Sequence, residues 1–298
     1  MNLGYACINT ALSANKIMTN RTMRRKTFDA RGIDYVSDLA LLNVKDLKTI
    51  IQWNNEMGIK LFRLSSQIFA WSDEYKLSDL KDYDEICSMM LEIGKIATDA
   101  NQRLTMHPGP YNCLASPNQK VVEKTIRELN CHSEQFNMLG FKPSNYNKIN
   151  IHVGGAYGDK KETLKRFCKN FELLNDDTKK RLVIENDDSP NEYSVKDLFD
   201  GIYQTIGIPI TFDYFHHKFN TGGLTEEEAL KMAAITWPEG IAQCCHYSES
   251  RRKEKLDESI RPQAHSDIIY EKIQTYGLEP DIVIEAKLKE QAIFKRVI

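Results

Sequence analysis

The chain has 298 residues, of which 41% are hydrophobic and 28% charged, and its formal net charge is −2 at pH 7. This composition is typical of a soluble globular domain with a sizeable core, and it excludes an overall basic field as the means of holding nucleic acid. Bound cations would still reverse the charge of an acidic pocket, so the balance does not exclude nucleic acid as a partner.

Compartment and membrane association follow from the ends of the chain and its cysteines. No apolar stretch approaches the roughly 18 residues of a membrane span. Residues 1–16 lack the basic start and long apolar centre of a signal peptide. The seven cysteines form no CxxC pair and no regular framework, which is typical of reduced thiols. We therefore expect an intracellular protein, cytoplasmic or nuclear, that is not secreted and has no membrane partner.

Short apolar runs rich in strand-forming residues predict the β-strands, and segments with apolar residues at helical spacing predict the helices between them. In chain order the predicted strands are residues 3–8, 59–64, 103–107, 148–152, 181–185, 209–213, 241–246 and 281–285. The predicted helices are residues 44–57, 80–100, 118–139, 160–174, 194–206, 225–236, 265–276 and 286–296.

Regular alternation of strand and helix predicts a closed (β/α)8 barrel, a TIM barrel, as a single α/β domain over residues 1–298. In such barrels the functional groups come from the C-terminal ends of the strands. Residues 9–43 form an unusually long first connection that is polar and basic. A loop of that length in a compact domain is more often functional than idle.

Metal-capable side chains recur where the later predicted strands end. These residues are His107, His152, Glu185, Asp213, His246 and Glu285. His216, three residues after Asp213, and His265, before the last strand, join the candidate set. Each histidine alone is more simply read as a structural or surface residue, but strand ends meet at one mouth of a barrel, and this favours a shared site.

The predicted site is a cluster of divalent metal ions. Mixed imidazole and carboxylate ligands suit Zn, Mn or Fe, and eight ligands are too many for one tetrahedral ion but suit two or three ions. Glu185 lies centrally in strand order, so its two oxygens are placed to bridge two ions, whereas His217 is expected to point away from the cluster. Multi-metal sites stabilise the attacking and leaving oxygens of phosphate displacement.

Nine short strings also carry a resemblance to a known family. They are GYACIN (4–9), FRLSS (62–66), MHPGPY (106–111), IHVGGAYGDK (151–160), VIENDD (183–188), FDYFHH (212–217), CHYSES (245–250), AHSD (264–267) and IEAK (284–287). Together they span nearly the whole chain and resemble the UV damage endonuclease family, a TIM-barrel relative of endonuclease IV. The resemblance implies metal-dependent cleavage of damaged double-stranded DNA immediately 5′ to UV photoproducts. Cleavage would leave a 3′-hydroxyl and initiate excision repair.

The resemblance further implies a cofactor and residue roles. The expected cofactor is a cluster of two or three divalent ions, Mn²⁺ in the first place and Zn²⁺ or Mg²⁺ as alternatives, and the expected state is a monomer. One ion is expected on His107, His152 and Glu185, a second on Glu185, Asp213, His246 and Glu285, and a third on His216 and His265. Glu185, His107 and Tyr5 are the expected catalytic residues.

DNA contacts are expected at the same mouth of the barrel. Tyr5 and Asn9 match positions near the lesion pocket, and Tyr111 matches an aromatic residue that probes the duplex. The remaining candidates are basic residues after the first and seventh strands, for which a solvated charged loop is the equal alternative: Arg24, Arg25, Arg251 and Arg252. Both groups lie on loops that follow strands, at the same face of the barrel as the metal candidates, and this favours contact with phosphates.

Two positions depart from the family pattern. Pro110 replaces a glutamine of the usual HPGQY, and a rigid, apolar proline fills a gap in the helix without hydrogen-bonding an orphaned base. Cys244, two residues before His246, stands where some members carry a lysine that is sometimes carboxylated. Both departures bear on lesion range and metal preference rather than on the reaction class.

Three rival interpretations remain open. An apurinic/apyrimidinic endonuclease of the endonuclease IV kind shares the metal ligands and differs in the loops that probe DNA. A metal-dependent sugar isomerase on the same barrel generally uses more carboxylates and a lysine near its substrate, and the histidines and basic loops disfavour it. A non-catalytic damage-binding protein has no need of a complete ligand set, and the full set seen here speaks against it.

Overall fold

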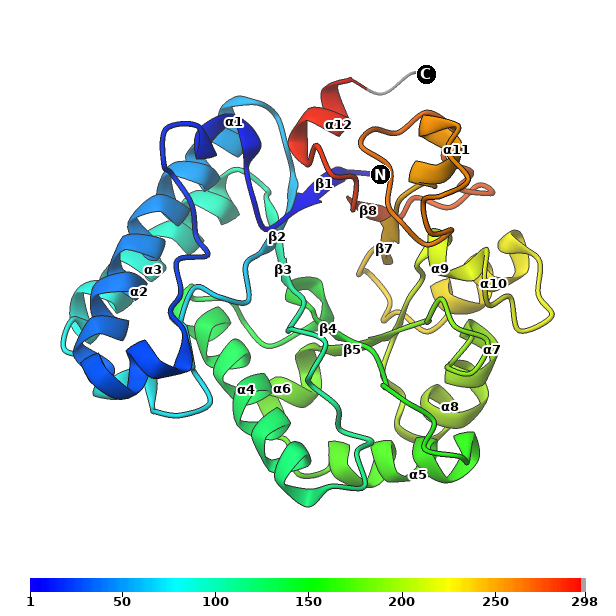
Figure 1. The fold of residues 1–298 in the computed structure, drawn as a ribbon, viewed down its shortest axis with the longest axis horizontal. Helices are drawn as coiled ribbons and strands as arrows, with labels where there is room; N and C mark the ends of the chain where they lie inside the picture. The colour runs from blue at the N-terminus through cyan, green and yellow to red at the C-terminus, as the bar shows by residue number, and fades with distance from the viewer. Residues whose placement is uncertain (296–298) are drawn as a thin grey trace.

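The computed structural model describes residues 1–295 as a parallel β-barrel surrounded by helices (Figure 1). Its eight strands are β1 (Leu3–Ala6), β2 (Leu61–Leu64), β3 (Arg103–Met106), β4 (Ile149–Ile151), β5 (Leu182–Glu185), β6 (Ile210–Thr211), β7 (Cys244–Tyr247) and β8 (Asp281–Ile284). They pair in the order β6-β5-β4-β3-β2-β1-β8-β7, and a parallel bridge between Asp213 and His246 joins the two edges. The predicted TIM barrel is confirmed. Residues 296–298, which the predicted domain included, lie outside the described residues.

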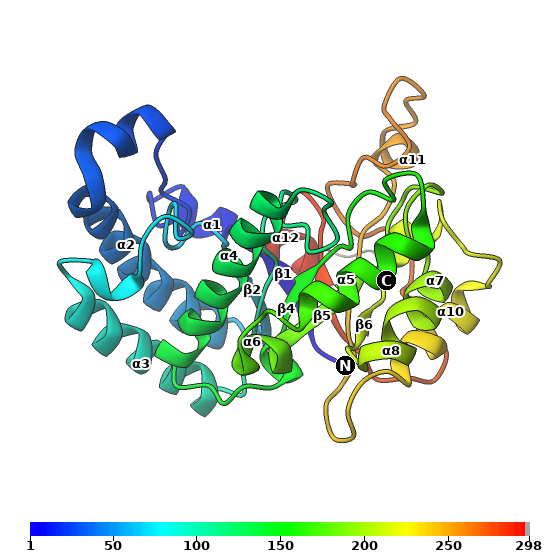
Figure 2. The same ribbon diagram turned by 90° about the horizontal axis from the view of Figure 1, so that it is seen from below.

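Helices follow most of the strands and cover the outside of the barrel (Figures 1 and 2). They are α1 (Thr10–Ser13), α2 (Arg25–Glu56), α3 (Tyr83–Asp99), α4 (Gln119–Met138), α5 (Lys160–Phe171), α6 (Asp176–Arg181), α7 (Val195–Leu198), the π-helix η3 (Phe199–Tyr203), α8 (Gln204–Ile206), α9 (Tyr214–His217), α10 (Glu226–Ala234), α11 (Arg251–Lys255) and α12 (Glu290–Phe294). Within residues 1–295 no helix combines the length and apolar character needed to cross a membrane.

Two predictions about the connections are wrong. Residues 25–43 belong to α2 rather than to a loop, and the backbone of Gly32 (φ 66°, ψ −165°) breaks this helix after its first two turns. The predicted helix over 265–276 is absent from the structure. There the buried carboxylate of Glu249 accepts hydrogen bonds from the backbone N–H groups of Tyr270 (2.7 Å) and Glu271 (2.8 Å). In a helix these N–H groups would donate to backbone carbonyls, but here they donate to a side chain, which favours a non-helical backbone.

Side chains at alternate strand positions fill the barrel in layers. At its N-terminal end Arg103 is fully buried and forms an ion pair of 3.1 Å with Asp281. Above it lies a small apolar layer that includes Leu61, Val183 and Val283. The outward-facing strand side chains pack beneath the helices in the main hydrophobic core. Polar side chains are thereby left to occupy the C-terminal mouth of the barrel.

Candidate metal centre

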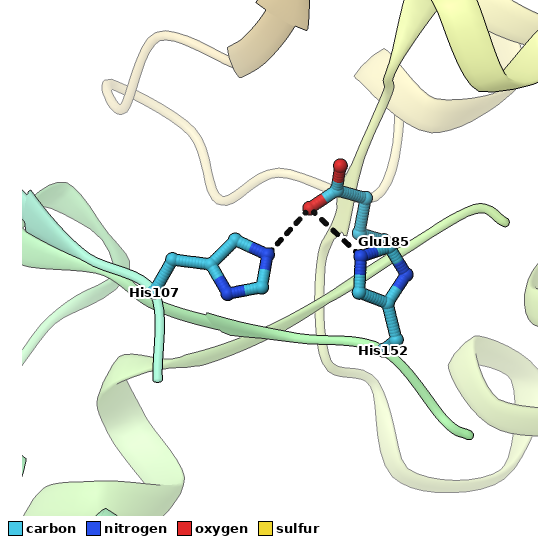
Figure 3. Close-up of side chains that lie close together, drawn as sticks. All are labelled: His107, His152 and Glu185. Carbon is cyan, nitrogen blue, oxygen red and sulfur yellow. Dashed lines mark ion pairs between the residues drawn. The ribbon is translucent and has the colours of Figure 1, made fainter. Parts of the chain in front are cut away.

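The structure brings the predicted ligands together at the C-terminal mouth of the barrel. Two groups of three residues place one nitrogen or oxygen atom of each member within 4.8 Å of the others, namely His107, His152 and Glu185, and Glu185, Asp213 and His216. Figure 3 shows His107 and His152, which follow β3 and β4, on two sides of the Glu185 carboxylate. Glu185 ends β5 and is the one residue that the two groups share.

The two carboxylate oxygens of Glu185 face different histidines. Its Oε2 atom lies 3.3 Å from Nε2 of His107 and 3.8 Å from Nε2 of His152. Its Oε1 atom lies 3.0 Å from Nδ1 of His246 and 3.7 Å from Nδ1 of His216. This arrangement is the one that a carboxylate bridging two ions requires.

The remaining predicted ligands lie beside the second group. Oε1 of Glu285 is 3.4 Å from Nδ1 of His246, and Oε2 of Glu285 is 3.8 Å from Nδ1 of His265. Arg63, at the end of β2, also forms an ion pair with Glu285. His216, expected with His265 on a third ion, lies close to Glu185 and Asp213. His217 is buried against Phe212, away from the cluster as expected.

A buried carboxylate oxygen without a hydrogen-bond partner indicates that these residues fit a divalent cation. Oδ1 of Asp213 accepts the backbone N–H groups of Phe215 (2.7 Å) and His216 (2.8 Å), but its buried Oδ2 atom has no hydrogen-bond partner within residues 1–295. A buried carboxylate oxygen without a partner is costly, and a cation satisfies it. The clustered atoms are imidazole nitrogens and carboxylate oxygens, a set that suits Zn, Mn or Fe.

Neighbouring groups fix the orientation of two histidine rings. Nδ1 of His152 lies 2.7 Å from Oδ1 of Asp187, and Nδ1 of His216 lies 2.8 Å from the carbonyl oxygen of Asn186. A partner on one ring nitrogen leaves the other for a metal, as in carboxylate–histidine–metal arrangements.

The protonation states of the clustered side chains determine the charge of the cluster when no metal is bound. Burial opposes ionisation of Glu185, but His246 and His152 hold its pKa well below its ordinary value. Burial likewise opposes protonation of His152, yet Glu185 and Asp187 raise its pKa to about 10. Burial also opposes protonation of His216, but Asp213 raises its pKa to about 9. Burial raises the pKa of Asp213 itself to about 7. His152 and His216 thus carry positive charge where cations are expected, whereas burial lowers the pKa of His107 and lowers that of His246 to about 4.

Tyr5 and Asn9 are buried and hydrogen-bonded to each other. Tyr5 is fully buried, and its hydroxyl donates to Oδ1 of Asn54 (2.7 Å) on α2 and accepts from Nδ2 of Asn9 (2.9 Å). Burial also raises the pKa of Tyr5, so its hydroxyl keeps its proton. Tyr5 therefore faces the helix layer, and the expected contact of Tyr5 and Asn9 with a lesion and the catalytic role of Tyr5 stay predictions.

The loop after β3 exposes the residues expected to probe DNA. Pro110 is exposed, and the side chain of Tyr111 is 89% exposed. Tyr111 borders a cleft of about 360 Å³ that Trp71 and Lys124 also line. An exposed aromatic side chain of this kind is suited to stacking on a base.

Most of the predicted phosphate-binding arginines are engaged within the protein. Arg25 pairs with Asp29 (2.8 Å) and Glu74 (2.7 Å). Arg252 pairs with Glu258 (3.0 Å), and Arg251 lies 3.9 Å from Asp267. Arg24 is exposed, and the ion pairs found in residues 1–295 do not include it. Figure 2 shows the start of α2 and the segment around α11 on the same side of the barrel, at opposite flanks.

Sequence reasoning missed several polar residues that surround the cluster. They are Arg63, Lys148, Asn150 and Asp187. A signal for two of them was present, because Lys148, Asn150 and His152 alternate along one strand and therefore share its inward face. Asp187 lies two residues after Glu185 in a run of acids, where no periodicity distinguishes it from a surface residue.

Comparison with known proteins gives one consistent result. The family model described as UV-endonuclease UvdE matches residues 1–297. A UV-damage endonuclease from Schizosaccharomyces pombe is 38% identical over 304 residues, which are 98% of this chain and 49% of that protein. The chain thus spans about half the length of this relative. The crystal structure of SacUVDE matches with a TM-score of 0.84 and 30% identity, covering 98% of this chain and 95% of that one.

A more distant likeness concerns the fold alone. Endonuclease IV from Thermus thermophilus matches with a TM-score of 0.57 and 11% identity over 96% of this chain and 92% of that one. It shares the barrel architecture, but identity this low says nothing about its substrate in relation to this chain.

The raised pKa values predict how the metal-free protein responds to alkaline pH. Because His152 and His216 titrate near 10 and 9 in the folded protein, their contribution to stability is complete below their ordinary pKa of about 6.5 and is lost as pH rises through 9 to 10. In urea unfolding with a chelator present, the free energy of unfolding should fall more between pH 7 and pH 10 in the wild type than in a His152→Asn, His216→Asn double variant. Equal falls would contradict the assignment of charge to these rings.

Proposed function

The chain belongs to the UV-endonuclease UvdE family, and we propose that it is a metal-dependent endodeoxyribonuclease that nicks double-stranded DNA immediately 5′ to UV photoproducts. Cleavage leaves a 3′-hydroxyl and initiates excision repair. The observation that carries the proposal is the Glu185 carboxylate, which lies between two groups of imidazole and carboxylate ligands at the mouth of the barrel. The protein would act as a monomer in the compartment that holds the DNA.

The proposed ligands are the eight residues named from the sequence. His107, His152 and Glu185 would hold one ion, and Glu185, Asp213 and His216 lie closest to a second, with His246, Glu285 and His265 beside them. Bound divalent cations, Mn²⁺ in the first place, supply positive charge that stabilises the attacking and leaving oxygens of a phosphate displacement.

The chain's own residues would position these ligands and bring the phosphate to them. Glu185 keeps its carboxylate ionised in a buried setting, so both of its oxygens remain available as ligand atoms. Asp187 holds the ring of His152, and the carbonyl of Asn186 holds the ring of His216. Because these rings are fixed before a substrate arrives, little reorganisation opposes the reaction.

DNA would lie across the mouth of the barrel, with the loop after β3 directed at the lesion. Tyr111 is exposed on the loop that follows β3, so it is available to fill the space that damaged bases leave in the stack. Photoproducts distort and weaken stacking, so a protein that bends or opens the helix at such a site meets a lower cost there than in intact DNA. Selectivity would therefore come from deformability rather than from reading base edges.

The direct test uses purified protein, Mn²⁺ and end-labelled duplexes that differ at one position. One duplex carries a single UV photoproduct, one carries an abasic site and one is undamaged. We expect a nick immediately 5′ to the photoproduct, with a 3′-hydroxyl that a polymerase extends directly. Equal cutting of the undamaged duplex would contradict lesion specificity, and cutting of the abasic duplex alone would favour the endonuclease IV kind of activity.

Removing the shared carboxylate should abolish cleavage. Glu185→Gln keeps the size of the side chain but loses its charge, so we expect nicking to fall by at least about 10²-fold, the scale seen when one electrostatic group of an active site is lost. Binding to the lesion duplex, measured with Ca²⁺ or without metal, should remain within a few fold. Glu172→Gln changes an exposed glutamate that pairs with Lys179 and serves as the control. Nicking retained by Glu185→Gln would remove this residue from the bridging role.

Pro110 should influence which lesions are recognised. Pro110→Gln introduces a side chain that hydrogen-bonds bases, so we expect the ratio of nicking rates on two lesions, such as a cyclobutane dimer and an abasic site, to change by several fold. Pro117→Gln, an exposed proline just before α4, is the matched control. An unchanged ratio in Pro110→Gln would show that this position does not set lesion range.

A further inference from the structure

The histidines of the candidate metal centre do not all face it in the same way. Two of them, His107 and His152, place Nδ1 against a neighbouring oxygen (Pro108 O, 3.0 Å; Asp187 Oδ1, 2.7 Å) and direct Nε2 at Glu185. His246 is turned the other way. Its Nδ1 atom faces Glu185 and Glu285, and its Nε2 atom points into the barrel.

The atom that meets Nε2 of His246 is the Nζ atom of Lys148. Lys148 directly precedes β4 and is fully buried inside the barrel. Its Nζ atom lies 3.2 Å from Nε2 of His246, and it donates to Oγ1 of Thr211 (2.8 Å) and to Oδ1 of Asn150 (3.1 Å). These three neighbours lie on three different strands, β4, β6 and β7, so Nζ is held from several sides.

These contacts close into a ring. Nδ2 of Asn150 donates to Oε2 of Glu185, and Oε1 of Glu185 faces Nδ1 of His246. Lys148, Asn150, Glu185 and His246 are thus linked in sequence and back to the start. A closed network restricts each of its members more than a single pair does, because moving one group breaks two contacts.

We propose that Lys148 is a positioning residue for the candidate metal centre, whose Nζ atom selects the orientation in which His246 presents Nδ1 to Glu185 and Glu285. Turning the imidazole by 180° about its Cβ–Cγ bond would place carbon atoms where the two nitrogens now lie. Lys148 opposes that turn because Nζ would then face a carbon atom and lose one of its three partners. The use of the centre for DNA cleavage rests on the proposed function, but the orientation of the ring does not.

Lys148→Met tests this proposal, since methionine is unbranched and of similar length but has no nitrogen at its end to meet Nε2 of His246. We expect Mn²⁺ affinity, measured without DNA by the electron paramagnetic resonance of free Mn²⁺, to weaken by about 10-fold or more, as is usual when a partner of a metal-binding histidine is lost. On the lesion duplex kcat should fall while KM stays near the wild-type value. Lys60→Met is the control, because Lys60 donates to the carbonyl of Ala100 (2.8 Å), away from the cluster.

The outcomes separate positioning from a purely structural role. A lower melting temperature with unchanged Mn²⁺ affinity in Lys148→Met would overturn the proposal. If that variant does not fold, Thr211→Val removes one partner of Nζ and leaves His246 intact, and unchanged Mn²⁺ affinity there would overturn it equally. A wild type that binds Mn²⁺ more tightly than Lys148→Met but never nicks damaged DNA would support the role of Lys148 and contradict the proposed function.

Discussion

Burial of an ionised carboxylate is the constraint on which the mouth of this barrel depends. Glu185 is almost completely inaccessible to solvent, and removing such a charge from water costs several kcal/mol unless other groups compensate. The protonated ring of His152 compensates by charge, Nδ1 of His246 lies 3.0 Å from Oε1, and Asn150 donates a hydrogen bond to Oε2. The compensating groups need partners of their own. Lys148 contacts His246, and Asp187 contacts His152.

The charged cluster lies at the C-terminal end of the barrel, above an interior that is closed by packed side chains. Arg103 and Asp281 close the N-terminal end, and apolar side chains such as Val183 and Val283 separate that ion pair from the cluster. The cluster therefore rests on tightly packed side chains, while the residues expected to meet DNA lie on loops above it. Rigid support with variable loops is the usual division of labour in this architecture.

The strands and the clustered side chains could be predicted from the sequence because both follow from short-range patterns. Strand-ending residues such as His107 and Glu185 converge in any closed parallel barrel, so their proximity did not depend on packing details. Packing decided the rest. The face of β1 that carries Tyr5 meets Asn54 of α2, and no local pattern in the first strand reveals that partner.

Long-range pairing explains the other differences between expectation and structure. Arg25 was expected to meet phosphates, but Glu74, 49 residues further along the chain, pairs with it after folding. The segment 265–276 has helical spacing, yet Glu249, earlier in the chain, captures its backbone donors. In each case a charged side chain from another part of the sequence outweighs a local preference.

Arg63 gives the centre a further property that bears on how the protein is made. Its ion pair with Glu285, together with the protonated rings of His152 and His216, supplies positive charge to the cluster from within the chain. Unlike small zinc domains, which stay unfolded until the ion arrives, this barrel has an internal counter-charge for its acids. The chain can therefore fold around these acids without waiting for an ion.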